Sequence, residues 1–188
     1  EIKETIKRIV RYSNPNPNKE TLFIWPEGIF AGIYLEDLKK FSNIFNKNFS
    51  KKHLLIFGIN TQDNSSDEFY NSLIVSNNNL EVLYKYDKKK LVPFGEFIPF
   101  NDLSEKFGLK KITQGYGSFS KGNKQKNFLF DDLNILPLIC YEIIFPKLTQ
   151  FSDKKTNMIV NISEDAWFGN SIGPHQHYTK AIFRSIEN

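Results

Sequence analysis

Apolar residues are grouped along the chain in short blocks that predict strands alternating with amphipathic helices. Ile2, Ile6 and Ile9 share one face of a helix predicted over residues 1–12, and a second apolar face at helical spacing predicts a helix over residues 35–49. Short apolar runs bounded by Pro, Asn or charged residues predict strands. These strands cover residues 21–25, 54–59, 71–76, 80–86, 128–130, 134–139 and 158–162.

The connections between these blocks indicate a mixed sheet. Three consecutive Asn residues at 77–79 separate two predicted strands and favour a tight antiparallel turn. Further helices are predicted over residues 142–151, where Pro146 weakens the pattern, and over residues 175–187. Residues 88–126 form a long irregular segment, of a length usually found at functional loops. The alternation of strands and helices predicts an α/β fold and one domain over residues 1–188.

Composition limits the classes of function. The 25 Lys and Arg residues exceed the 21 Asp and Glu residues by four, and this net charge of +4 is too small to indicate a nucleic-acid-binding protein. Cys140 is the single cysteine, so no disulfide forms within the chain. No apolar run reaches the ~18 residues of a membrane-spanning helix.

Three reactive residues follow apolar strands. Glu27, Lys88 and Cys140 come directly after the strands predicted at 21–25, 80–86 and 134–139. Sites in α/β folds form where strands end, so a carboxylate, an ammonium and a thiol are expected to converge there. A carboxylate can take the proton of an attacking thiol, and an ammonium can stabilise an oxyanion. Spacing alone also allows Glu27 to be a solvated loop carboxylate and Cys140 an inert buried cysteine.

Five sequence strings resemble a known family. WPE at 25–27, YDKKKL at 86–91 and CYE at 140–142 are similar to the three signatures of the nitrilase, or carbon–nitrogen hydrolase, superfamily. LVPFGEFIP at 91–99 and NISEDAWFGNSIGPHQH at 161–177 resemble one branch, the apolipoprotein N-acyltransferases. The resemblance covers residues 21–187. It implies an α-β-β-α sandwich with mixed sheets that lacks elements at both ends, so the domain at 1–188 is expected to be incomplete.

The resemblance also implies roles for six residues. Glu27 matches the general base, Lys88 rather than Lys89 or Lys90 matches the triad lysine, and Cys140 matches the nucleophile. Supporting residues of the pocket are matched by Glu96, Tyr141 and Glu142.

The implied reaction moves an acyl chain from a phospholipid to a lipoprotein. The thiol takes the acyl chain as a thioester, and the N-terminal amine of a diacylated apolipoprotein then accepts it. The implied location is the bacterial inner membrane, with this domain facing the periplasm. Attachment would be through membrane helices that this chain does not contain. We therefore expect the 188-residue chain to be inactive by itself.

The thioester must be protected from water, which draws attention to aromatic residues near the matched strings. Phe94, Phe97 and Phe100, together with Trp167 and Phe168, are candidates for an apolar lid; of these, Phe94, Trp167 and Phe168 are predicted to contact substrate. Each of them fits an ordinary core position equally well.

Other signals were weaker. His175 and His177, with Glu164 and Asp165 nearby, suggest a metal, but no further ligand pattern appears. No metal, cofactor or nucleic-acid partner is expected. The alternative functions are a soluble nitrilase-family amidase acting on a small amide, and a non-catalytic binding module.

Overall fold

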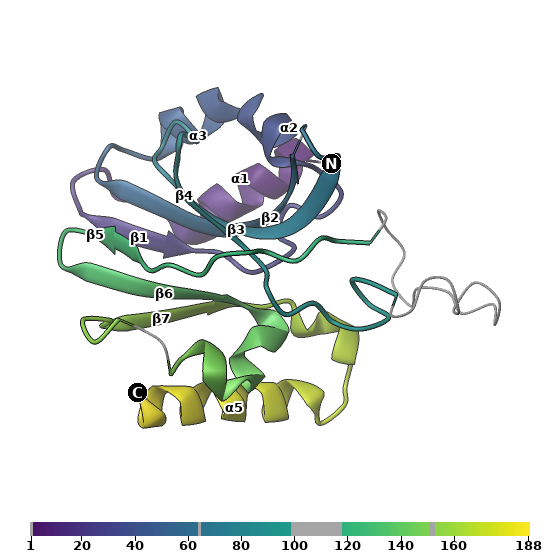
Figure 1. Ribbon diagram of the computed structural model, residues 1–188. Helices are drawn as coiled ribbons and strands as arrows, with labels where there is room; N and C mark the ends of the chain where they lie inside the picture. Colours follow the sequence, from purple (N-terminus) through teal and green to yellow (C-terminus); the bar gives the residue numbers. More distant parts are fainter. Residues whose placement is uncertain (1, 64, 99–117, 151–152) are drawn as a thin grey trace.

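The computed structural model describes residues 2–63, 65–98, 118–150 and 153–188. Its elements form four layers, which follow one another from the top to the bottom of Figure 1. Helices α1, α2 and α3 cover a first sheet, a second sheet lies against the opposite face of the first, and helix α5 covers the second sheet. The predicted α-β-β-α sandwich is confirmed.

The first sheet is mixed and has the strand order β1-β2-β3-β4. β1 pairs with β2 in parallel, whereas β2, β3 and β4 pair antiparallel. The predicted hairpin around residues 77–79 is confirmed by the β3–β4 pairing. The strands are β1 Thr21–Ile24, β2 His53–Asp63, β3 Glu68–Ser76 and β4 Val82–Asp87.

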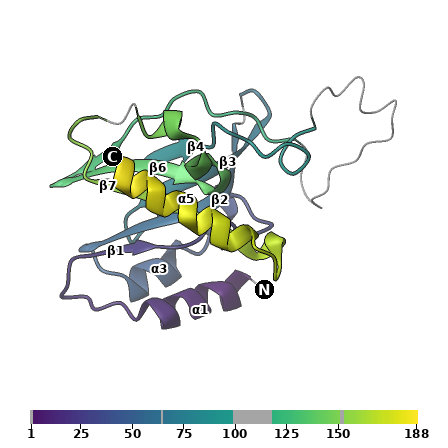
Figure 2. The ribbon, with the colours of Figure 1, turned by 90° about the horizontal axis from the view of Figure 1, so that it is seen from below.

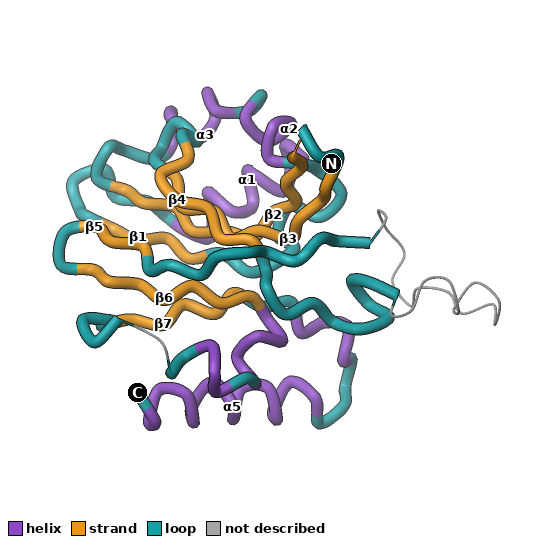
Figure 3. Tube along the Cα trace, in the orientation of Figure 1, coloured by secondary structure: helices purple, strands orange, loops and turns teal. Residues whose placement is uncertain are grey.

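The second sheet has the order β5-β6-β7 and is also mixed, with β5 antiparallel and β7 parallel to the central β6. Figure 3 shows its strands lying next to those of the first sheet. Ile56 and Leu73 of the first sheet pack in one buried cluster with Ile135 and Val160 of the second. The strands are β5 Phe128–Phe130, β6 Leu133–Ile139 and β7 Met158–Ile162.

The outer faces of the two sheets are covered by helices. α1, Ile2–Ser13, confirms the predicted N-terminal helix. The single helix predicted over residues 35–49 is wrong: the chain forms α2 at Leu35–Lys39 and α3 at Ser42–Asn48. Phe41 interrupts them with non-helical dihedral angles, and the apolar spacing persists because both helices cover the same core.

The helix predicted over residues 142–151 is also wrong, because Cys140–Ile144 and Pro146–Leu148 form two separate 3₁₀ turns, η1 and η2. Pro146 has no backbone N–H to continue a helix. A further 3₁₀ turn, η3, spans Asp165–Phe168. α5 spans Gly173–Glu187 and crosses the second sheet on the face seen in Figure 2.

The structure describes about half of the irregular segment predicted over residues 88–126, and the described residues, 88–98 and 118–126, form no helix or named strand. Residues 99–117, which include Phe100, lie outside the described part of the chain. Among helices in the described ranges, none is both long enough and apolar enough to cross a membrane.

Candidate active site

The ends of three strands bring the predicted reactive residues into one region. Glu27 follows β1, Lys88 follows β4, and Cys140 begins η1 directly after β6. The side chains of Glu27 and Lys88 are in direct contact, although 61 residues separate them in the chain. Lys88 and Cys140 line the same pocket.

Lys88 is held between two buried carboxylates. Its Nζ donates to Glu27 Oε1 at 3.1 Å and to Glu96 Oε1 at 2.9 Å. The Asn71 side-chain amide donates to the same two oxygens, at 2.7 and 2.8 Å. The second oxygen of Glu96 accepts from the backbone N–H of Val92 at 2.8 Å. One ammonium and one amide therefore hold both carboxylates in fixed orientations.

Lys88 is more deeply buried than the two lysines that follow it. Lys88 is 1% exposed, whereas Lys89 is half-buried and Lys90 is exposed. Burial by itself would lower the pKa of Lys88, but the Glu27 and Glu96 carboxylates outweigh it and raise that pKa. The side chain is therefore an ammonium at neutral pH.

Cys140 has a strained backbone and a protonated thiol. Its φ of 50° lies in the left-handed region, which costs a non-glycine residue of order 1 kcal/mol or more. Burial raises the pKa of the thiol to about 11, and the nearby Glu27 carboxylate adds to this effect. The Lys88 ammonium and a hydrogen bond with Ser163 act in the opposite direction. At neutral pH the sulfur therefore needs a base before it can attack.

Glu142 connects the segment that carries Lys88 with the segment that carries Cys140. Its carboxylate is fully buried and accepts the backbone N–H groups of Lys89 and Lys90 at 2.7 and 2.9 Å. It also accepts the N–H of Ile139, the residue before Cys140, at 2.9 Å. The Tyr86 hydroxyl donates to both of its oxygens. Burial raises the pKa of Glu142, while these hydrogen bonds act against the increase.

A pocket of about 460 Å³ is lined in part by Cys140. Tyr141, Trp167 and Phe168 line it together with Lys88 and Cys140. Tyr141 packs edge-to-face on Phe145, with ring centroids 5.0 Å apart. Trp167 and Phe168 are 57% and 48% exposed, so their rings form the outer wall rather than a core.

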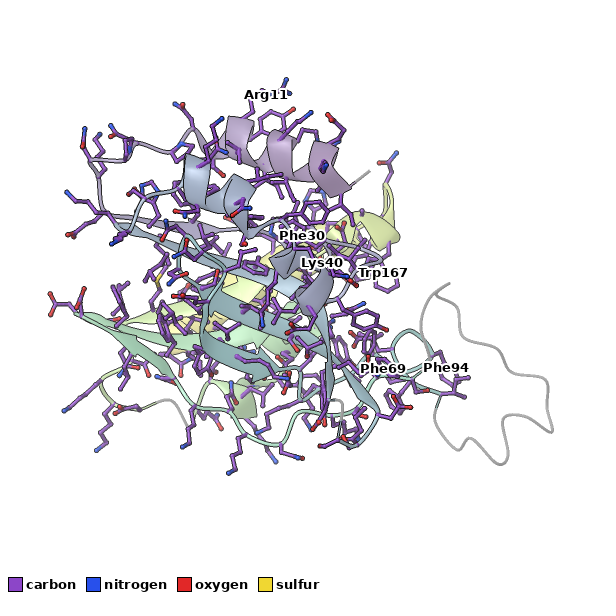
Figure 4. All side chains as sticks on the ribbon, turned by 90° about the horizontal axis from the view of Figure 1, so that it is seen from above. Arg11, Phe30, Lys40, Phe69, Phe94 and Trp167 are labelled. Atoms are coloured by element: carbon purple, nitrogen blue, oxygen red, sulfur yellow. The ribbon has the colours of Figure 1, made fainter. Side chains whose placement is uncertain are left out.

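Of the aromatic residues predicted for a lid, Phe94 is placed differently. It is 38% exposed and is not among the described residues that line this pocket. Figure 4 shows Phe94 and Trp167 toward the same end of the molecule, on separate segments.

Several residues that build the site did not stand out in the sequence. Asn71 lies within the strand β3, where its polar side chain breaks an apolar run and is the only local signal. The sequence pattern suggests a role for Asp165 and His177 only as metal ligands. Asp165 and His177 hydrogen-bond to each other, and their polar atoms and the Cys140 sulfur lie within 4.8 Å of one another. His175, the other histidine of the H-x-H string, is exposed.

Comparison with known proteins shows the family to which the chain belongs. The family model described as carbon-nitrogen hydrolase matches residues 3–188. The chain belongs to the carbon-nitrogen hydrolase family. Solved structures with the same fold include a carbon-nitrogen hydrolase from Helicobacter pylori, with a TM-score of 0.66 and 16% identity over 99% of this chain and 65% of that one. Saccharomyces cerevisiae Nit3 has a TM-score of 0.64 and 20% identity over 96% of this chain and 65% of that one.

Relatives with higher identity carry a more specific name. An apolipoprotein N-acyltransferase of Rhizobium leguminosarum is 33% identical over 173 residues, which cover 90% of this chain and 32% of the relative. One of Bradyrhizobium diazoefficiens is 37% identical over 173 residues, covering 89% of this chain and 32% of the relative. This carbon-nitrogen hydrolase chain thus spans about a third of the length of these relatives.

Proposed function

We propose that this carbon-nitrogen hydrolase domain transfers a fatty acyl chain from a phospholipid to the N-terminal amine of a diacylated apolipoprotein, through a thioester on Cys140. The observation that carries the proposal is the pairing of the buried Lys88 with Glu27 and Glu96 beside a pocket that Cys140 lines together with aromatic side chains. The names of the relatives support the choice of substrates.

In the first half-reaction, the Cys140 sulfur attacks the ester carbonyl of the phospholipid while Glu27 takes the thiol proton. The need for this base follows from the raised pKa of the thiol. The Lys88 ammonium stabilises the negative oxygen of the tetrahedral intermediate. The intermediate collapses, the glycerol oxygen leaves with the proton from Glu27, and a lysophospholipid is released.

In the second half-reaction, the lipoprotein amine attacks the thioester carbon. Glu27 takes a proton from the amine, and the sulfur leaves as a thiolate beside Lys88 and regains that proton. An amide is formed, and the enzyme returns to its first state. Two successive acyl transfers at one sulfur predict ping-pong kinetics.

The supporting residues act on the geometry of these steps. Glu96 and Asn71 hold Lys88 and Glu27 through shared hydrogen bonds. Glu142 links the segments of Lys88 and Cys140, and Tyr141 contributes to the pocket wall. Small displacements of reacting groups cost large factors in rate, so we assign these residues to positioning.

The aromatic walls favour acyl transfer over the alternative of a small-amide hydrolase. Trp167 and Phe168 line the pocket with exposed rings, which suit an acyl chain and limit the access of water to a thioester. An amidase needs water to reach the acyl-enzyme. We propose the same contact with substrate for Phe94, from its position in the string matched at 91–99.

The substrates place the reaction at a membrane. We propose that it takes place at the bacterial inner membrane, with this domain facing the periplasm and attached through segments outside these 188 residues. The relatives are about three times as long as the part matched here, since the match covers 32% of each. We therefore propose that residues 1–188 form an incomplete domain that does not transfer acyl chains by itself.

The decisive experiment is mass spectrometry of the full-length protein incubated with phospholipid vesicles in detergent and no acceptor. The expected result is one added acyl chain on the peptide that contains Cys140, released when a diacylated lipopeptide is added. Cys140→Ser is the matched control and should give no thioester. Acylation of another residue, or no adduct while a small amide is hydrolysed, would replace this proposal with the amidase.

A further inference from the structure

A chain of hydrogen bonds leads from Ser163 to the backbone of Cys140. The Ser163 hydroxyl donates to Asp165 Oδ1 at 2.6 Å. Asp165 contacts His177 Nδ1 through both of its oxygens, at 2.9 and 3.1 Å. His177 Nε2 lies 3.0 Å from the Cys140 carbonyl oxygen, where the chain of hydrogen bonds ends. This chain joins the loop after β7, the turn η3, helix α5 and the turn η1.

Both nitrogens of His177 face groups that only accept hydrogen bonds. The Asp165 carboxylate and the Cys140 backbone carbonyl have no proton to donate. A neutral imidazole carries one N–H and satisfies one of these contacts, whereas an imidazolium donates to both. His177 is 9% exposed, so an unsatisfied nitrogen there would have little access to water. Only the imidazolium can donate to both groups at once.

We propose that His177 is a positioning residue that, as an imidazolium anchored by Asp165, holds the strained Cys140 in its reactive orientation and favours its thiolate. The proposal rests on the assignment of Cys140 as the nucleophile. A positive φ at Cys140 persists only if its surroundings hold it, and the carbonyl contact is one such restraint. The imidazolium also adds a positive charge to the pocket that Lys88 and Lys180 line together with Cys140.

Charged groups on several elements surround His177. Asp165 on η3 is its direct partner, while Lys88 after β4 and Lys180 one turn farther along α5 line the same pocket. Glu27, after β1, acts on the Cys140 thiol. A neutral imidazole can donate to only one of the Asp165 carboxylate and the Cys140 carbonyl, so we expect the reactivity of Cys140 to fall with rising pH relative to a variant without a titrating group.

The cluster also has a spacing that a metal could use, since ligand atoms of Cys140, Asp165 and His177 lie within 4.8 Å of one another. Both imidazole nitrogens are already engaged in hydrogen bonds, one with Asp165 and one with the Cys140 carbonyl. A metal would have to break one of these hydrogen bonds, so the hydrogen-bonded chain accounts better for the arrangement.

The test measures two rates on the full-length protein between pH about 6 and 9: alkylation of Cys140 by iodoacetamide, and acylation of Cys140 by phospholipid. His177→Gln keeps a donor near the carbonyl but does not titrate. Ionisation of Cys140 changes both rates with pH. Dividing the wild-type rate by the His177→Gln rate removes the part of this pH dependence that the two proteins share. We expect this ratio to fall by about tenfold as pH rises, the size of change expected from losing one nearby charge.

Three further variants separate positioning from folding. His177→Ala should slow both reactions by on the order of 10². Asp165→Asn should slow both reactions in the same direction as His177→Ala, because the imidazole loses the carboxylate that orients it. His175→Ala, on the exposed side of α5, should leave both rates unchanged. Circular dichroism identifies any variant that does not fold.

A pH-independent rate ratio, or wild-type rates of alkylation in a folded His177→Ala variant, would overturn the role of His177. If alkylation follows the expected profile but phospholipid gives no acyl adduct on the wild type, the positioning role stands and the acyltransferase proposal fails. The two proposals are thus judged by separate readouts.

Discussion

Glu96 lies eight residues after Lys88, and its Oε1 accepts a hydrogen bond from Lys88 Nζ at 2.9 Å in the buried interior of the site. The same ammonium is shared with Glu27. Two carboxylates at such short distance from one lysine form a charged unit with a net negative charge when all three groups are ionised. The stability of this unit depends on the ammonium remaining in place.

Replacing Lys88 by Met should destabilise the protein and abolish acyl transfer. Removal of one partner from a buried charge cluster typically costs about 3–5 kcal/mol, because the remaining charges lose their compensation. Lys89→Met is the matched control, since its half-buried side chain makes no ion pair among the described residues. Urea unfolding should show a change within about 0.5 kcal/mol for that control. Equal effects of the two substitutions would contradict the burial and pairing described for Lys88.

Gly58 on β2 should be required for the position of Glu27. A Cβ atom at Gly58 would lie 2.8 Å from the backbone Cα of Glu27, closer than real contacts allow, and 3.1 Å from Ile162 Cδ1, a tight contact. Gly58→Ala should therefore displace the Glu27 backbone and lower the rate of acyl-enzyme formation by on the order of 10².

Gly32→Ala provides the comparison for Gly58→Ala. A Cβ at Gly32 meets nothing within 4 Å, but its φ of 82° strains any other residue. Gly32→Ala should lower the free energy of unfolding by about 1 kcal/mol and leave the rate of acylation unchanged. If Gly58→Ala acylates at the wild-type rate, the close approach of β2 to Glu27 has no catalytic consequence.

The stability of the protein should depend on the ionisation of Cys140 at alkaline pH. The pKa of the thiol is raised from 9.0 to about 11 in the folded state, so folding favours the protonated form. Its contribution is complete below pH 9.0 and is lost as pH rises through about 11. Relative to Cys140→Ser, the wild type should lose about 2–3 kcal/mol across this window. Urea unfolding of both proteins at several pH values measures the difference, and a constant difference would show that burial does not perturb the thiol.

Trp167 should protect the thioester from water. Trp167→Ala opens the outer wall of the pocket, so the acyl-enzyme should hydrolyse faster and the yield of acylated lipopeptide should fall severalfold. Tyr178→Ala is the control: Tyr178 is 69% exposed on α5 and is not among the described residues of the pocket. Release of free fatty acid and of acylated lipopeptide is followed by mass spectrometry. Unchanged partitioning between the two products in Trp167→Ala would contradict a role for this wall in excluding water.

Local patterns in the sequence were sufficient for most strands and for the residues that follow them. The apolar runs that precede Glu27, Lys88 and Cys140 can be recognised in the sequence, because a buried strand needs apolar side chains at consecutive positions. The same patterns were misleading where two short helices cover one core, at residues 35–49, and where Pro146 divides a predicted helix into 3₁₀ turns.

The partners of the reactive residues were decided by the tertiary structure. Asn71, on a neighbouring strand, joins Glu27 to Glu96, and Glu142 fastens the segment after Lys88 to the residue before Cys140. These contacts join residues separated by 25 to 53 positions, apart from the local contact of Glu142 with Ile139. No repeating pattern of residues in the sequence indicates hydrogen bonds of this kind, because they depend on which strands become neighbours when the two sheets form and pack. The sequence by itself therefore determined which reactive groups stand at the ends of strands, and the packing of sheets and helices decided which groups orient them.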